Sequence, residues 1–199
     1  MSRLSESGVD LSRKGVVWLG GEAVPVARTG DDRAVARLLP PGPAERPVVA
    51  ALFGEDLAPT IEPVTEPAGT LAVGGRSKKD ALAAIDRWYR RQARDRIEAA
   101  AATESERLGL HPEKISIRDQ KTRWGSCSTS GTLSFNWRLV IGPEHALRYV
   151  VIHELVHIEH HNHSRRFWAA LTKALPDWKR SAVWLRANER ALTAYKPKI

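Results

Sequence analysis

The chain is poor in sulfur: its 199 residues include one cysteine, Cys127, and one methionine, Met1. A single cysteine excludes any disulfide within the chain, which is typical of proteins kept in a reducing compartment. No uncharged apolar run approaches the roughly 18–20 residues that a membrane-spanning helix needs. We therefore expect a cytoplasmic protein that does not enter the membrane.

One apolar stretch near the N-terminus is superficially like the centre of an export signal. Residues 15–27 read GVVWLGGEAVPVA, in which Glu22 interrupts the apolar run and Pro25 follows it. A signal peptide needs an uninterrupted apolar centre. We therefore predict a strand here and not an export signal.

Acidic residues are scarce in the second part of the chain, which is strongly basic. Residues 76–199 contain 24 Lys and Arg against 13 Asp and Glu, whereas residues 1–75 contain 7 against 10. Such a positive field favours acidic partners, including nucleic acid, nucleotides and other anions. A solvated basic surface without a partner has the same composition, so both interpretations stay open.

The patterning also divides the chain into two parts, residues 1–75 and 76–199. Over residues 16–53, short apolar runs alternate with Gly, Pro and Asp, which predicts short strands and hairpins. Residues 54–76 are rich in Pro and Gly and predict a loop or linker. The first part is therefore expected to be a β-rich segment that ends in this loop.

The second part predicts an α+β fold, in which a small antiparallel sheet packs on helices. Ser77 and Asp80 form a capping box at the start of a long helix that Gly109 closes. Residues 114–140 instead alternate with a period of two, which indicates three antiparallel strands with a hairpin turn at Ser130-Gly131. Three further helices are predicted, over residues 143–157, 164–175 and 176–195.

Five of the seven histidines lie within residues 153–163. His153 and His157 are four residues apart, so on a helix they share one face, and both rings can bind one metal ion at about 2.0–2.1 Å. Glu154 lies about 100° further round the helix, where it can contact a water on that metal. This H-E-x-x-H spacing is typical of two zinc ligands and a general base. It also arises by chance, but two unpaired histidines on a buried helix would be unfavourable.

A catalytic zinc needs a third protein ligand, and His160, His161 and His163 are the candidates. On a continuous helix, His160 would lie roughly 10.5 Å along the axis from His153, too far for three rings to converge. The Asn-His-Ser sequence at 162–164 instead predicts a chain reversal and a new helix cap. This reversal favours His163, with His160 and His161 as the alternatives.

Residues 121–168 resemble the YgjP-like metallopeptidase family, which is related to the zincin peptidases. The shared motifs are WGSCS at 124–128, NWRL at 136–139, HELVH at 153–157, NHS at 162–164 and FW at 167–168. The resemblance implies a zincin-like metallopeptidase domain over residues 76–199. It also implies one Zn²⁺ ion held by His153, His157 and His163, with Glu154 as the catalytic base.

The spacing to the third histidine is also similar to that of Wss1/SprT-like proteases, which act on DNA–protein crosslinks. Metzincins share this spacing, but they carry glycine where this chain has His160. The only methionine is Met1, so the Met-turn of metzincins cannot form. We therefore reject the metzincin interpretation.

The resemblance to zincins places a strand before the metal helix that could pair with an extended substrate. The candidate substrate-binding residues are Arg123, Trp124, Gly125 and Ser126. Trp124 could equally belong to the core, and Arg123 could bind an anion or face solvent. Trp137 alternates with buried-type residues and is predicted to lie in the core.

The sequence thus predicts a zinc-dependent hydrolase, with peptide cleavage as the first interpretation and a polypeptide as its substrate. Hydrolysis of nucleotide phosphoanhydrides is the alternative, although no Gly-x-x-x-x-Gly-Lys phosphate loop is present. A DNA-associated protease is a further alternative because of the basic second part. A nucleic-acid-binding module with a structural metal is disfavoured, since such sites commonly use four protein ligands with several cysteines.

Overall fold

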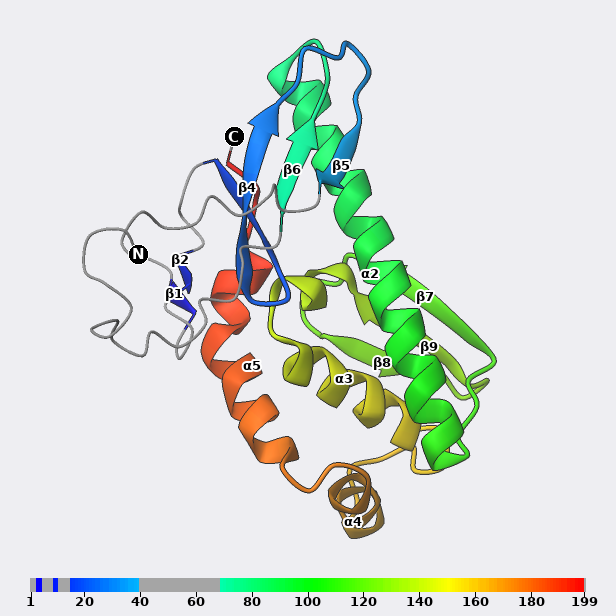
Figure 1. Cartoon of the computed structure of the whole chain (residues 1–199). Coiled ribbons are helices and arrows are strands. Elements are labelled where there is room, and N and C mark those ends of the chain that lie inside the picture. Colours follow the sequence, from blue (N-terminus) through cyan, green and yellow to red (C-terminus); the bar gives the residue numbers. More distant parts are fainter. Residues whose placement is uncertain (1–2, 5–8, 11–14, 40–68, 199) are drawn as a thin grey trace, which may run out of the picture.

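The computed structural model describes residues 3–4, 9–10, 15–39 and 69–198. The strands predicted over residues 40–53 and most of the Pro- and Gly-rich segment, residues 54–68, lie outside the described residues. The described part combines helices with small sheets, so the predicted α+β class is confirmed (Figure 1). The predicted boundary between residues 75 and 76 stays a prediction.

The N-terminal strands form a four-stranded sheet with the order β3-β4-β6-β5. Its strands are β3 (Val16–Leu19), β4 (Glu22–Arg28), β5 (Ala36–Leu39) and β6 (Thr70–Val73). β3 and β4 form a hairpin, which confirms the strand prediction for residues 15–27. Gly20 and Gly21 make its tight turn, since both have positive φ angles that favour glycine. A separate two-stranded pairing joins β1 (Arg3–Leu4) to β2 (Val9–Asp10).

The long helix α2 (Lys78–Leu108) is confirmed with both of its predicted ends. Ser77 and Asp80 form the capping box, and Gly109 closes the helix with a φ of 68°. α2 packs against β5 and β6 at its first end and against α3 (Glu144–Val156) and β7 (Lys114–Arg118) further along. One apolar core therefore runs along this helix from the N-terminal sheet to the C-terminal elements.

The C-terminal sheet has the order β7-β9-β8, with β8 (Gly125–Cys127) at one edge and β9 (Thr132–Asn136) in the centre. The hairpin between β8 and β9 is confirmed. The prediction of a wholly antiparallel sheet is wrong, because β7 pairs with β9 in parallel. β9 buries Leu133 and Phe135 completely, so it takes the central position, and the chain after β7 crosses to the far side of β9.

The third predicted strand ends earlier than its alternating pattern indicates. Residues 137–141 form a 3₁₀ helix, η2 (Trp137–Ile141), because the Asn136 side chain accepts a hydrogen bond from the Arg138 amide and caps it. Trp137 is 4% exposed and lies in the core, as predicted. An alternating pattern that continues into buried residues therefore does not locate the strand end.

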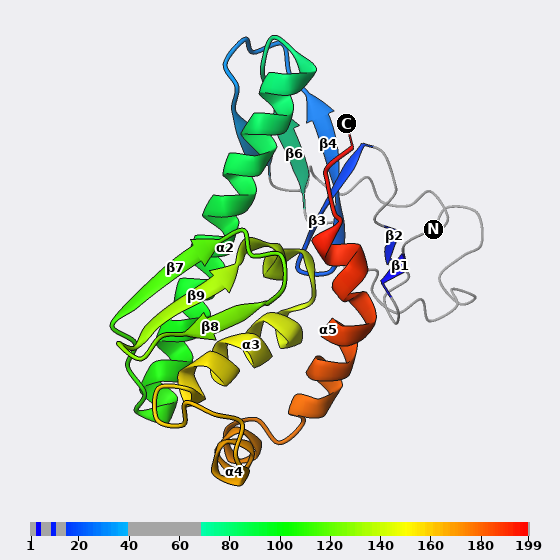
Figure 2. The same cartoon turned by 180° about the vertical axis from the view of Figure 1, so that it is seen from behind.

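The three C-terminal helices are α3, α4 (Arg165–Ala174) and α5 (Trp178–Thr193), close to the predicted ranges. α3 begins one residue later than predicted, since Pro143 keeps an extended conformation with a ψ of 156°. α3 packs between α2 and α5, and Figure 2 shows the β7-β9-β8 sheet covering it from the other side. No helix among the described residues is long and apolar enough to cross a membrane.

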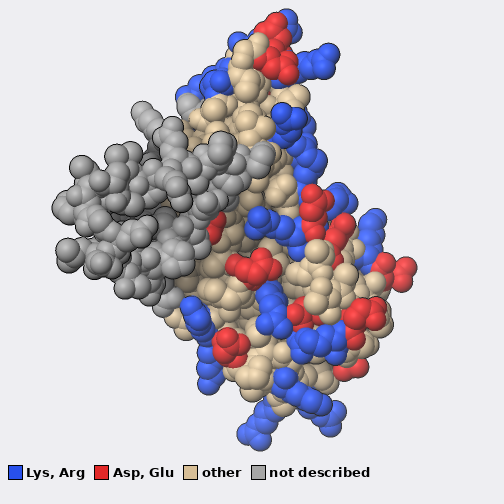
Figure 3. Space-filling view, viewed as in Figure 1, with Lys and Arg blue, Asp and Glu red and all other residues tan. Residues whose placement is uncertain are grey.

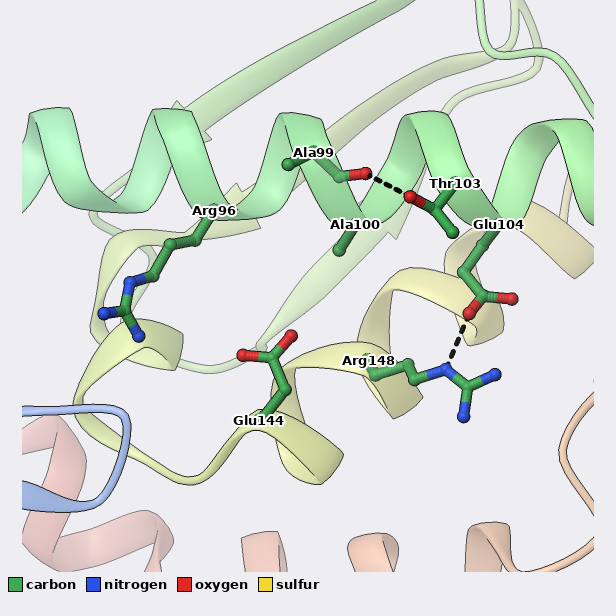
Figure 4. Close-up of a pocket in the computed structure, with 7 residues that line it drawn as sticks. All are labelled: Arg96, Ala99, Ala100, Thr103, Glu104, Glu144 and Arg148. Atoms are coloured by element: carbon green, nitrogen blue, oxygen red, sulfur yellow. Dashed lines mark hydrogen bonds and ion pairs between the residues drawn. The ribbon is translucent and has the colours of Figure 1, made fainter. Parts of the chain in front are cut away.

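A buried carboxylate on α2 joins this helix to α3 (Figure 4). Glu104 accepts hydrogen bonds from Arg148 of α3 at 2.6 Å and from Arg107 of α2 at 2.6 Å. Beside this pair is a pocket of about 410 Å³ between the two helices. The pocket contains no histidine, so we assign the ion pair a structural role in fixing the position of α3.

Candidate metal centre and active site

The end of α3 and the start of α4 bring three predicted ligands together. His153 lies on the last turn of α3, and His157 is the residue that ends this helix. The chain then reverses, and Ser164 caps α4 by accepting a hydrogen bond from the Phe167 amide. The predicted reversal over residues 161–163 is therefore present, and it places His163 directly before the new helix.

The Nε2 atoms of these three histidines form a nearly equilateral triangle. The distance is 3.2 Å from His153 to His157, and His163 lies 3.1 Å from each of them. An ion held at about 2.0–2.1 Å in tetrahedral geometry separates its nitrogen ligands by roughly 3.3–3.4 Å. The triangle therefore fits one face of a tetrahedral zinc site, with the fourth position left for water or substrate.

The remaining ring nitrogens support the same assignment of ligand atoms. His157 Nδ1 lies 2.8 Å from the backbone carbonyl oxygen of His160. A carbonyl oxygen only accepts hydrogen bonds, so Nδ1 donates and the Nε2 atom of a neutral ring keeps its lone pair. Such a hydrogen bond to a carbonyl is typical of metal-binding histidines. His160 thus contributes its backbone, and neither its ring nor that of His161 joins the cluster.

His153 is held in the neutral form that a metal ligand requires. Burial, together with the smaller effects of the neighbouring His157 and His163, lowers the pKa of His153 to about 3. Its Nδ1 atom is buried and has no hydrogen-bond partner among the described residues. At neutral pH the ring is therefore already uncharged, as metal binding requires.

A phenylalanine forms the apolar support beneath the cluster. The Phe167 ring is fully buried, and its centroid lies 4.9, 4.5 and 4.7 Å from those of His153, His157 and His163. Trp168 stacks on His163 with centroids 5.5 Å apart. The FW sequence at 167–168 therefore packs against the rings of the cluster, with Phe167 buried and Trp168 partly exposed.

Glu154 lies beside this cluster and directly against the edge strand β8. It is 5% exposed, and burial raises its pKa to about 8, against the opposing effect of the Arg123 guanidinium. A Cβ atom added to Gly125 would stand 2.5 Å from a Glu154 carboxylate oxygen. The carboxylate thus occupies the space that only a glycine leaves open.

Two pockets meet at Gly125, His153 and Glu154. One has a volume of about 350 Å³ and is lined by further residues of β8 and of the cluster. The other, of about 340 Å³, extends between Trp124 on one side and α3 and α5 on the other. We call the two together the cleft.

All four predicted substrate-binding residues line the cleft. Arg123 and Trp124 line the second pocket, Ser126 the first, and Gly125 both. Trp124 is half-buried and also packs against the core, so both of its predicted roles are compatible with its place. Substrate contact by these residues stays a prediction.

Tyr149 is a cleft residue that the sequence analysis missed. It precedes His153 by four residues and lines the second pocket with it. Burial raises the pKa of Tyr149, with a further contribution from the Glu154 charge. Its position one helical turn before a predicted ligand was a signal that could have identified it.

The chain matches the model of one known protein family. The model of the YgjP-like metallopeptidase domain matches residues 54–188, more than half of the chain. Two similar solved structures are metallopeptidase zymogens, Pyrococcus abyssi abylysin and Methanocaldococcus jannaschii jannalysin, each 23% identical. They cover 52% and 48% of this chain and 99% and 96% of their own, with TM-scores of 0.40 and 0.41. No curated protein matched. On the family match, the chain belongs to the YgjP-like family of metallopeptidase domains.

Proposed function

We propose that the chain is a zinc-dependent peptidase with Glu154 as its general base. The observation that carries this proposal is the triangle of Nε2 atoms beside a buried carboxylate in an open cleft. Membership of a metallopeptidase family supports the reaction class. The all-nitrogen ligand set with an open fourth position favours zinc in a catalytic rather than a structural role.

A zinc ion in this position would supply a Lewis acid and lower the pKa of water to about 7. Glu154 would accept a proton from the attacking water and deliver it to the nitrogen of the leaving amine. Burial raises the pKa of Glu154 to about 8 in the metal-free chain, and the positive charge of a zinc ion bound beside it would favour the ionised carboxylate that accepts the proton. Gly125 allows the carboxylate to lie at this point of the cleft.

The strand β8 is suited to hold an extended peptide. It pairs only with β9 among the described strands, so its other edge has no strand partner there, and its three residues line the cleft. A peptide that adds to such an edge gains backbone hydrogen bonds that do not depend on its sequence. We therefore expect unfolded or flexible polypeptides as substrates.

Hydrolysis of nucleoside triphosphates is the second candidate, favoured by one observation. Arg123 and Arg186 both line the second pocket, and no ion pair holds either of them among the described residues. Guanidinium groups bind phosphate well. Nucleic acid as a partner stays a prediction; in Figure 3 the basic side chains of the described residues are interspersed with acidic ones.

The test is a parallel assay of the zinc-loaded chain on an unfolded protein and on nucleoside triphosphates, each with and without DNA. We expect peptide cleavage by the wild type, and a Glu154→Gln variant that keeps its zinc and loses turnover. Full activity in that variant would contradict the proposed base. Phosphate release without peptide cleavage would replace the peptidase proposal with the second candidate.

A further inference from the structure

The three tyrosines of the chain differ in what their hydroxyl groups do. Tyr89 and Tyr195 lie in the core with their hydroxyl oxygens 3.1 Å apart, and Tyr89 also bonds the backbone of Trp18. Tyr149 is half-buried, and its hydroxyl has no hydrogen-bond partner among residues 15–39 and 69–198. This hydroxyl is not among the buried polar atoms that lack a partner, so it is open to solvent. The Tyr149 hydroxyl is therefore a donor that the fold itself does not use.

The Tyr149 side chain belongs to the cleft. Tyr149 lies one turn before His153 on the same face of α3, and their ring centroids are 5.7 Å apart in an edge-on contact. It lines the second pocket together with His153 and Glu154. The phenol also lies within electrostatic reach of the Glu154 carboxylate. Tyr149 therefore lines the same pocket as the proposed base and the first predicted ligand.

A row of stacked rings holds Tyr149 in place. Its ring lies parallel to that of Trp178, with a centroid distance of 6.3 Å and an interplanar angle of 14°. Trp178 stacks on Trp168 at 4.9 Å, and Trp168 stacks on His163 at 5.5 Å. Trp178 is itself fixed by a hydrogen bond from its Nε1 to Thr172 Oγ1 at 3.0 Å. The same aromatic row therefore positions both the third histidine and the phenol.

We propose that Tyr149 is a further catalytic residue, whose phenol donates a hydrogen bond to the scissile carbonyl oxygen as that oxygen gains negative charge. This inference rests on the proposed peptidase function. The water oxygen bonds to the carbonyl carbon, the carbon–nitrogen bond breaks, and Glu154 carries the water proton to the amine. The phenol keeps its own proton throughout. A prepositioned donor of this kind stabilises the transition state more than the bound substrate.

Tyr149→Phe tests this proposal because it removes the hydroxyl and keeps the ring that stacks on Trp178. We expect kcat to fall on the order of 10²-fold, as for the loss of one oxyanion donor, with little change in KM. Zinc content should equal that of the wild type. Tyr195→Phe is the matched control, since it removes a hydroxyl that bonds only within the core, and we expect its kcat to stay unchanged.

A binding measurement separates this role from a structural one. A phosphinic peptide carries a tetrahedral anionic group in place of the scissile amide, so its affinity reports stabilisation of the transition state. By calorimetry, Tyr149→Phe should weaken this ligand by about the same factor as kcat/KM. The uncleaved peptide should bind equally to Glu154→Gln chains with and without Tyr149→Phe.

The outcomes distinguish the two proposals. A wild type that cleaves peptides, together with an equally active Tyr149→Phe, would overturn the role of Tyr149 alone. Loss of zinc, or equal weakening of both ligands, would show that Tyr149 only supports the structure. A wild type that cleaves no peptide would remove the proposed function and this inference with it.

Discussion

Gly125 and Glu154 share one space: a Cβ atom on the glycine would stand 2.5 Å from a carboxylate oxygen and 2.6 Å from Cγ of the glutamate. Real Cβ atoms do not approach other atoms so closely, so one of the two residues would have to move. Glu154 is held in the cleft by burial, with no hydrogen bond among the described residues to fix it. The edge of β8 thus sets the position of the proposed base.

Gly125→Ala should therefore displace Glu154 and lower kcat/KM by at least about ten-fold, since a misplacement of about 1 Å can decrease a rate 10²-fold. The φ angle of Gly125 is not in the left-handed region, so alanine adds no backbone strain. We expect zinc content and the thermal midpoint to change little. Peptide turnover and zinc content measured on the same sample check this.

Gly30→Ala is the matched control, because a Cβ atom there meets nothing within 4 Å and the glycine has no positive φ. Its activity should equal that of the wild type. If Gly125→Ala cleaved peptides as fast as Gly30→Ala, the contact with Glu154 would have no catalytic consequence.

Removal of the third histidine should weaken zinc binding specifically. We expect His163→Ala to decrease the affinity by more than about 100-fold, since loss of an outer-shell partner alone decreases it 10–100-fold. His161→Ala and His160→Ala should bind zinc like the wild type, because neither ring belongs to the cluster and His160 bonds His157 through its backbone carbonyl. Competition with a chelator of known affinity measures all three. Unchanged affinity in His163→Ala would contradict our choice of ligand.

Local sequence rules predicted those parts of the molecule that depend on near neighbours in the chain. The four-residue spacing of His153 and His157 places both on one helix face, and the Ser77 capping box fixes the start of α2. Both features depend on contacts within one or two helical turns. The same reasoning placed His163 beside the first two histidines, because the reversal before Ser164 is also local.

The parts that sequence reasoning missed depend on contacts between distant segments. The parallel pairing of β7 with β9 depends on which strand is buried most. No short turn joins these two strands, so no turn motif in the sequence indicates their pairing. The contact of Gly125 with Glu154 joins positions 29 residues apart through the packing of β8 on α3. Tyr149 was missed because a tyrosine on a buried helix also fits core packing, and its place in the cleft depends on how α5 and β8 pack against α3.

The raised pKa of Glu154 predicts how the stability of the metal-free chain depends on pH. The folded state holds a proton on Glu154 up to about pH 8, whereas the unfolded chain loses it near 4.5. The contribution of Glu154 to the free energy of unfolding is fully present below pH 4.5 and is lost as pH rises to about 8. Glu154→Gln has no group that titrates here. Its free energy of unfolding should therefore rise relative to that of the wild type as pH increases between these values.

Urea unfolding of both metal-free chains at a series of pH values measures this difference, with an upper limit of about 1.4 kcal/mol per pH unit. The lowered pKa of His153 acts with the opposite sign, because its stabilisation is lost as pH falls from 6.5 to about 3. It is present in both chains and cancels in the comparison. A difference independent of pH would show that Glu154 is ionised in the folded protein.

Glu104 should contribute more to stability than any exposed ion pair of α2. Its side chain is 5% exposed and accepts hydrogen bonds from Arg148 and Arg107. Burial alone would raise the pKa of Glu104, but the hydrogen bonds and charges of the two arginines outweigh it and lower the pKa. The stabilisation is thus present above the unfolded pKa and is lost as pH falls through the lower folded value.

Glu104→Gln keeps the shape of the side chain but removes its charge, so both arginines lose their counter-ion. Each of them is about two-fifths exposed, so solvent screens part of the loss, and we expect about 1–3 kcal/mol at pH 7. Glu98→Gln is the control, because its ion pair with Arg94 is exposed at 3.6 Å and contributes about 0–0.5 kcal/mol. Urea unfolding should therefore separate the two variants at pH 7, and the separation should decrease in acid. Equal stability at pH 7 would mean that apolar packing alone holds α3, and with it the histidines, against α2.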